Sequence, residues 1–189
     1  MNQNGKSKSK AEPGRKGRRA YLDEYEMDDS GRYVYTGTAY VWKSPRKASM
    51  RTLWLLAAAS FGAQLAAGCV SNTGMNGRAW VLLPYAAAIA ASVSLVWGNY
   101  TLADGGEKIP GHIYRKSVEA LPIRALLTAV FSSIAIVGEL VNLLWQSQFT
   151  GSISGALLYA LAEAGSLVFA VLLRIAVRRL EWEEKDAEP

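Results

Sequence analysis

Four long apolar stretches, separated by short polar connections, dominate the pattern of this chain. They cover residues 52–70, 79–98, 125–145 and 153–173. Each holds roughly 20 residues, and a helix of that length spans about 30 Å, the thickness of the hydrocarbon layer of a bilayer. The pattern therefore predicts an all-α membrane protein, built as a bundle of four transmembrane helices.

Charged residues are nearly absent from these stretches. Between residues 52 and 98 the only Lys, Arg, Asp or Glu is Arg78, which falls in a connection. Between residues 125 and 173 the only ones are Glu139 and Glu163. Because buried helices of a water-soluble protein usually keep a polar face, this pattern favours a membrane over a soluble core.

The basic residues predict how the helices are oriented. Of the 21 Lys and Arg residues, all but Arg78 lie before the first stretch, in the middle connection or after the last stretch. Positively charged segments stay on the cytoplasmic side of a membrane, so we expect both termini in the cytoplasm. Tryptophan favours the membrane interface and agrees with this topology. The inner boundary is expected at Trp54, Trp97 and Trp182, and the outer boundary at Trp80 and Trp145.

The polar segments divide the rest of the chain. Residues 1–20 are predicted to be a disordered basic tail, 21–51 a cytoplasmic juxtamembrane segment, 52–178 the transmembrane domain and 179–189 a charged cytoplasmic tail. The basic tail either binds anionic lipid head groups, at about 1 kcal/mol per basic residue, or is a solvated segment that fixes the orientation. Nucleic acid is a less favoured partner, because five acidic residues follow within residues 23–29.

Two short cytoplasmic segments have recognisable patterns. Residues 32–42 alternate aromatic and smaller side chains about Thr36 and Gly37, which predicts a β-hairpin. From His112 onward, the apolar residues of the middle connection fall on one face of a short helix, with Arg115, Lys116 and Glu119 facing water. This helix is expected to lead into the third transmembrane stretch at Pro122.

The last two stretches each carry a stripe of small or polar residues at four-three spacing, which keeps them on one helix face. When the chain folds about Phe149 into an antiparallel helical hairpin, the two stripes meet. The first consists of Thr128, Ser132, Ala135, Glu139, Asn142 and Gln146, and the second of Ser152, Ala156, Tyr159, Glu163, Ser166 and Ala170.

The two intramembrane glutamates are the candidate functional residues. A carboxylate at this depth costs several kcal/mol unless it is protonated, paired or hydrated. No Lys or Arg lies in a stretch at their depth to neutralise them. One interpretation is a proton or cation site formed by Glu139, Glu163, Asn142, Tyr159 and Gln64. The other is a structural role, with neutral carboxylic acids hydrogen-bonded within the hairpin or paired with charges of another subunit.

The chain offers little material for other chemistry. Cys69 is the only cysteine and His112 the only histidine, so the sequence provides no disulfide, redox pair, bis-histidine haem site or zinc cluster. We expect no cofactor, no metal and no enzymatic activity. The segment 65–69 resembles the cleavage box of bacterial lipoproteins, but the polar region before it is too long for a signal peptide.

Three segments give the chain a loose family likeness: Tyr33 to Gly37, the Gly68-Cys69 end of the first stretch, and Val118 to Pro122. In these the chain resembles uncharacterised small four-span integral membrane proteins of Gram-positive bacteria. The resemblance implies a location in the bacterial plasma membrane and brings no activity, cofactor or site.

Two functions remain after these exclusions. The first is a non-enzymatic accessory or interaction subunit that contacts a membrane-protein partner or another copy of the chain. The second is a small oligomeric transporter, coupled to protons or cations through Glu139 and Glu163. A foreign partner that purifies with the protein favours the first function, and a symmetric homo-oligomer favours the second.

Overall fold

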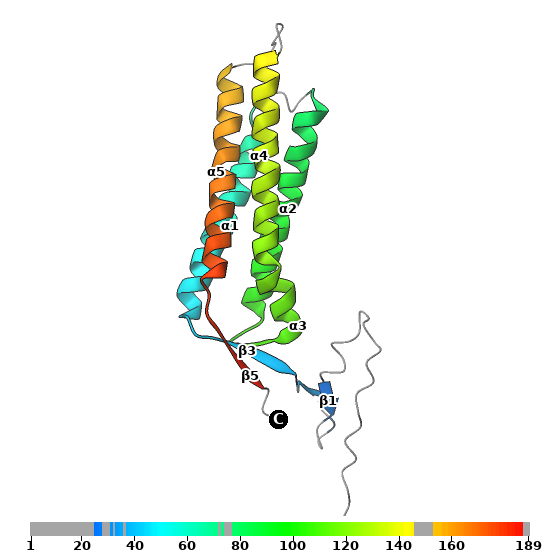
Figure 1. Ribbon diagram of the computed structural model, residues 1–189, viewed down its shortest axis with the longest axis vertical. Helices are drawn as coiled ribbons and strands as arrows, with labels where there is room; N and C mark the ends of the chain where they lie inside the picture. Colours follow the sequence, from blue (N-terminus) through cyan, green and yellow to red (C-terminus); the bar gives the residue numbers. More distant parts are fainter. Residues whose placement is uncertain are drawn as a thin grey trace, which may run out of the picture.

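The computed structural model describes residues 25–27, 31, 33–35, 37–71, 73, 77–145 and 153–186. The predicted basic tail, residues 1–20, lies outside the described residues. Four long helices run side by side, and a small sheet lies at one end of them (Figure 1). We call this end of the bundle the sheet end and the opposite end the loop end.

The four helices are α1 (Arg46–Gly68), α2 (Ala79–Asp104), α4 (Leu121–Trp145) and α5 (Ile153–Arg178). Each contains most or all of one predicted stretch, and each extends further toward the sheet end. The sequence pattern marks where apolar residues stop, whereas a helix continues through polar residues for as long as its backbone hydrogen bonds continue. Pro45 precedes the first residue of α1, where its missing N–H leaves no intrahelical bond unmade.

Three helical segments are long and apolar enough to cross a membrane: α2, α5 and the run Gly111–Leu144, which includes α4. Helix α1 is not among them. It has 23 residues but contains Gln64 and three basic residues near its start (Arg46, Lys47 and Arg51), which lower its mean hydropathy. The prediction of membrane-crossing helices is therefore supported for three of the four stretches, and not for residues 52–70 in α1.

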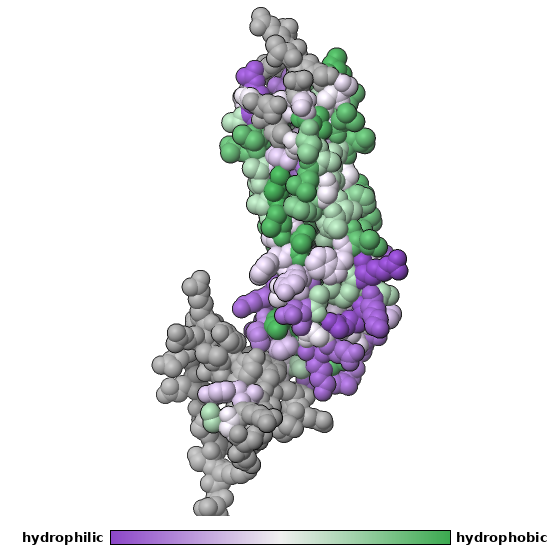
Figure 2. Space-filling view, turned by 180° about the vertical axis from the view of Figure 1, so that it is seen from behind, coloured by the Kyte–Doolittle hydropathy of each residue, from purple (hydrophilic) through white to green (hydrophobic). Residues whose placement is uncertain are grey.

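Each helix packs against two neighbours. Helix α4 contacts α5 and α2, and helix α1 contacts α5 and α2, so the helices form a closed ring. The predicted antiparallel hairpin of α4 and α5 is confirmed. Apolar side chains cover the outside of the ring, and hydrophilic residues gather at its sheet end (Figure 2).

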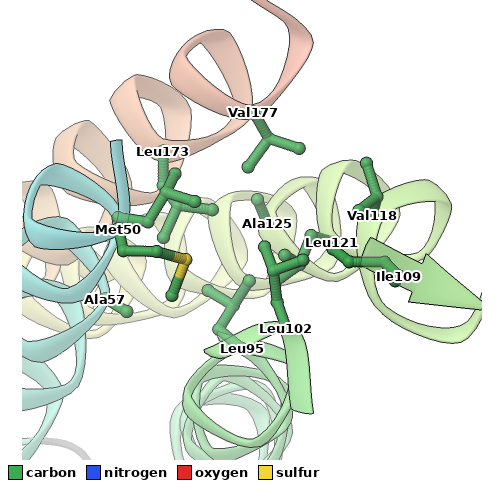
Figure 3. Close-up of a cluster of buried hydrophobic side chains, with 11 residues drawn as sticks. Met50, Ala57, Leu95, Leu102, Ile109, Val118, Leu121, Ala125, Leu173 and Val177 are labelled. Atoms are coloured by element: carbon green, nitrogen blue, oxygen red, sulfur yellow. The ribbon is translucent and has the colours of Figure 1, made fainter. Parts of the chain in front are cut away.

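Two apolar clusters fill the inside of the bundle. The larger one, the sheet-end core, draws residues from all four long helices (Figure 3). Its members are Met50, Leu53, Ala57, Leu95, Leu102, Ile109, Val118, Leu121, Ala125, Leu173 and Val177. The smaller one, the loop-end cluster, consists of Ala67, Val81, Tyr85, Ala135 and Tyr159. On α1, α4 and α5 the buried residues between these two clusters are mostly polar.

The prediction of a β-hairpin at residues 32–42 is wrong. Strand β3 (Thr38–Trp42) pairs with β4 (Lys108–Pro110) on one side and with β5 (Trp182–Asp186) on the other, both antiparallel. Strand β2 (Tyr33–Tyr35) pairs with β1 (Tyr25–Met27) instead of β3. A lone hairpin is marginal in water, whereas β3 gains two partner strands from the segments that leave α2 and α5. The predicted charged tail after residue 179 thus contains a strand.

Contacts between aromatic side chains stabilise the pairing of β3 with these distant strands. The rings of Tyr40 and Tyr114 stack with centroids 3.9 Å apart, and those of Trp42 and Trp182 lie 4.2 Å apart. Tyr114 also meets Trp182 edge to face at 5.3 Å. Such pairs stabilise by about 0.5–1.5 kcal/mol each beyond their buried area. Each of these contacts involves a residue outside the predicted hairpin.

The predicted short helix of the middle connection is confirmed. It consists of α3 (Gly111–Tyr114) followed by the π-helical segment η3 (Arg115–Glu119), which leads into α4. The charged residues Arg115, Lys116 and Glu119 are exposed, while Val118 and Leu121 are buried in the sheet-end core.

Candidate functional site

The predicted stripe on α4 lies inside the bundle. Its described members are all buried, with exposed fractions between 0% and 4%. They are Thr128, Ser132, Ala135, Glu139 and Asn142; Gln146 lies outside the described residues. The exposed positions of the same helix are apolar, for example Leu126, Val130 and Val137. Helix α4 thus buries its polar stripe inside the bundle and exposes apolar side chains on the outside.

The stripe on α5 is buried in the same way, at 0% to 3% exposure. Its described members are Ala156, Tyr159, Glu163, Ser166 and Ala170, and Ser152 lies outside the described residues. Because α4 and α5 pack side by side with both stripes turned inward, the prediction that the stripes meet is confirmed. Water-soluble proteins show the opposite distribution of polar and apolar residues.

Gln64 of α1 is the centre of the polar contacts. Its amide nitrogen Nε2 lies 2.7 Å from Ser132 Oγ, 3.0 Å from Glu163 Oε2 and 3.0 Å from Ser166 Oγ. An amide nitrogen carries only two N–H groups, so the three acceptors share them. The side chain is fully buried and connects α1, α4 and α5 at one level.

Two further residues extend this network. The Ser60 hydroxyl donates to the backbone carbonyl of Ser166 at 3.2 Å and lies 3.1 Å from its Oγ. The Tyr85 hydroxyl, from α2, donates to the backbone carbonyl of Gln64 at 3.1 Å. We call the connected side chains Ser60, Gln64, Ser132, Glu163 and Ser166 the polar layer. It lies between the sheet-end core and the loop-end cluster, and Tyr85 links it to α2.

Several buried polar atoms of this region have no hydrogen-bond partner among the described residues. They are Gln64 Oε1, Glu163 Oε1, the Tyr159 hydroxyl and Asn142 Oδ1. Tyr159 lies close enough to Glu163 and Glu139 to interact electrostatically with both. A buried polar atom without a partner costs about 1–3 kcal/mol, so this region favours a proton, an ion or a water molecule near these oxygens.

The remaining carboxyl group, Glu139, is 1% exposed and lies on the same face of α4 as Ser132, two turns nearer the loop end. Of the five predicted site residues, Gln64 and Glu163 are therefore in direct contact, and Tyr159 lies close to both glutamates. Glu139 and Asn142 share the buried face but lie closer to the loop end.

Among the described residues, no basic side chain is buried in the bundle with the two glutamates. Over the same residues, no group of three or more His, Cys, Asp and Glu side chains is arranged to hold a metal ion. The two carboxyl groups therefore depend on hydroxyl and amide groups, or on protonation, to be tolerated.

Sequence reasoning missed Ser60 and Tyr85. Ser60 had a detectable signal, because it precedes Gln64 by four residues and so shares its helix face. Tyr85 had none, since its contact depends on how α2 packs against α1. Gly68 is part of that packing, as a Cβ atom there would overlap the Tyr85 hydroxyl.

The fold and the buried polar stripes define a mostly helical protein with three helices able to cross a membrane, which indicates a multi-pass membrane protein. No protein-family model, curated protein or solved structure matches the chain. Its function must therefore be argued from its own residues.

Proposed function

We propose that the protein is a non-enzymatic accessory or interaction subunit of the bacterial plasma membrane, with four membrane-spanning helices and both termini in the cytoplasm. Helix α1 crosses the membrane together with α2, α4 and α5 and so completes the four spans. Its polar residues Ser60 and Gln64 are fully buried in the bundle, while its exposed positions include Leu55 and Leu65. A helix with this distribution satisfies its polar groups inside the protein and presents apolar groups to lipid.

Cys69 gives a direct test of this topology. It is the only cysteine, it is exposed, and it follows the loop end of α1. A membrane-impermeant maleimide should label it on intact cells. In a Cys69→Ser background, Lys185→Cys should react only after permeabilisation, and Cys69→Ser alone measures the background. Labelling of Lys185→Cys on intact cells would contradict the topology. The mass of the intact protein checks that Cys69 is unmodified.

The proposed interaction role rests on an exposed face of α1 with small side chains, which we call the open face. Ala58, Gly62 and Ala66 recur every four residues and are all exposed. A Cβ atom built on Gly62 would meet no atom within 4 Å. The exposed positions of α4 and α5 carry mainly Leu, Val and Ile instead. Small residues at this spacing let the backbone of a second helix approach closely, which is how helices associate in membranes.

Co-purification in a mild detergent tests this role. We expect a stoichiometric partner that is lost in Gly62→Leu, because the leucine side chain keeps the partner helix at a distance. Val168→Leu adds bulk to the exposed face of α5 and serves as the matched control, which should keep the partner. Retention of the partner by Gly62→Leu would exclude this face as the contact. A symmetric homo-oligomer without a foreign protein would favour the next candidate.

The unpaired oxygens near the polar layer favour a second candidate, a small oligomeric transporter coupled to protons or cations. Glu163 Oε1, Gln64 Oε1 and the Tyr159 hydroxyl are buried and lack partners among the described residues. Ionisable residues inside a membrane bundle commonly mark ion pathways and proton relays. In this candidate Glu163 binds the coupling ion, Glu139 is the second carboxyl group on the pathway, and the open face of α1 forms the contact between copies.

Glu163→Gln tests the transport candidate, because glutamine keeps the shape of the side chain but cannot be protonated in its place. Proton uptake into liposomes under an imposed potential, followed with an enclosed pH-sensitive dye, should be abolished. Glu119→Gln changes an exposed acid outside the bundle and should behave like the wild type. Unchanged proton flux in Glu163→Gln would remove this residue as the coupling group, and no flux in the wild type would remove the candidate.

A further inference from the structure

A cavity of about 220 Å³ lies between α4 and α5 near the sheet end, separate from the polar layer and from the open face of α1. Five of its lining residues are apolar and two are arginines. They are Ala125, Leu126, Ala129, Val171, Arg174, Ile175 and Arg178. The cavity thus combines an apolar wall with a concentrated positive charge.

The two arginines lie one helical turn apart on α5, so they share a face of that helix. Arg174 Nε is buried and has no hydrogen-bond partner among the described residues. No acidic residue lines the cavity, and no ion pair joins either arginine to a carboxylate within the described residues. The cavity therefore presents N–H donors and positive charge that an anion would satisfy.

The depth of the cavity indicates what kind of anion would fit there. Arg174 lies about 31 Å along α5 from the loop-end residue Ile153, which is about the thickness of the hydrocarbon layer. The guanidinium group is thus at the level of lipid head groups. Leu126 and Val171, which are 39% and 40% exposed, lie toward the membrane interior from it.

We propose that this cavity binds an anionic phospholipid. Arg174 and Arg178 donate hydrogen bonds to its phosphodiester oxygens, and one acyl chain lies along Leu126 and Val171. A guanidinium group is planar and matches two phosphate oxygens at once, which a lysine does not. The apolar wall distinguishes a phospholipid from a free phosphate ion, and two uncompensated positive charges favour an anionic over a zwitterionic lipid.

The test measures lipid binding to the purified full-length protein in dodecyl maltoside, by native mass spectrometry and by the shift in melting temperature. Phosphatidylglycerol should bind at least tenfold more tightly than phosphatidylcholine of the same acyl chains. Arg174→Gln should weaken phosphatidylglycerol binding about tenfold, equivalent to about 1.4 kcal/mol. Arg174→Lys should recover only part of this loss. Arg178→Gln changes an exposed side chain and gives a second variant that the fold tolerates.

Arg179→Gln is the matched control, because Arg179 is exposed and does not line the cavity. It should bind phosphatidylglycerol like the wild type. Equal binding of the two lipids, or wild-type binding by both cavity variants, would overturn the proposal. An equal loss in Arg179→Gln would indicate attraction to surface charge in general. An equal thermal shift from inorganic phosphate alone would assign the cavity to a free anion.

Discussion

The sheet-end core and the polar layer hold the same helices together by different means. In the sheet-end core, Leu95, Leu102 and Leu173 are fully buried among other apolar side chains (Figure 3). In the polar layer, about two turns further along α1, α4 and α5, hydrogen bonds join Gln64 to Ser132, Glu163 and Ser166. The interior of the bundle thus changes from apolar packing in the sheet-end core to hydrogen bonds in the polar layer.

The difference reflects what surrounds each region. Beyond the apolar stretches, at the far tip of the sheet end, the outer surface is hydrophilic (Figure 2), so burying core residues such as Leu102 and Val118 there removes apolar surface from water. At the level of the polar layer the outer surface is apolar and fits lipid. Lipid tails are as apolar as leucine, so burial alone gives little preference for the bundle. Close packing and hydrogen bonds must then select which faces meet.

The largest effect should follow from a cavity in the sheet-end core. Leu173→Ala removes a fully buried side chain and should lower the free energy of unfolding by about 2–5 kcal/mol. The measurement is a titration of the detergent-solubilised protein with dodecyl sulfate, followed by tryptophan fluorescence. Leu172→Ala is the matched control, because its side chain is 43% exposed on the apolar surface and should change stability little. Equal effects of the two variants would contradict the comparison.

The helices and the buried stripes could be predicted from the sequence because both depend on local periodicity. A four-three spacing on one helix places Ser132 and Glu139 on the same face whatever surrounds that helix. Gln64 was also predicted as a site residue, because it is the only amide side chain of its stretch and lies at a depth similar to that of the two glutamates. Residues 52–70 were predicted as a span as well, but α1 is not among the three helices apolar enough to cross a membrane, because three basic residues lie near its start.

The sheet could not be predicted, because its pairing joins segments far apart in the chain. Residues 32–42 have the sequence pattern of a local hairpin, but β3 pairs with Lys108–Pro110 and Trp182–Asp186. Only the packing of the helices brings those segments together, and no short-range pattern reports it. The same limit applies to Tyr85, whose hydrogen bond to the Gln64 carbonyl depends on the contact between α1 and α2.

A smaller effect should follow from the polar layer. Gln64→Leu keeps the approximate volume but removes the contacts with Ser132, Glu163 and Ser166. Hydrogen bonds between membrane helices contribute about 0.6 kcal/mol on average, and the two N–H groups of Gln64 limit the number made at once. The variant also removes Oε1, which lacks a partner among the described residues. We therefore expect a loss of about 1 kcal/mol in the same titration.

The double variant of Gln64→Leu with Ser132→Ala separates the hydrogen bond from packing. If the 2.7 Å contact between these side chains is formed, the two losses should be less than additive by about 0.6 kcal/mol. Ser94→Ala is the matched control for the serine change, because the Ser94 hydroxyl bonds to the Ala91 carbonyl within its own helix. Its loss should add to that of Gln64→Leu. A loss in Gln64→Leu larger than that in Leu173→Ala would reverse the comparison, since hydrogen bonds rather than apolar packing would then dominate the stability of the bundle.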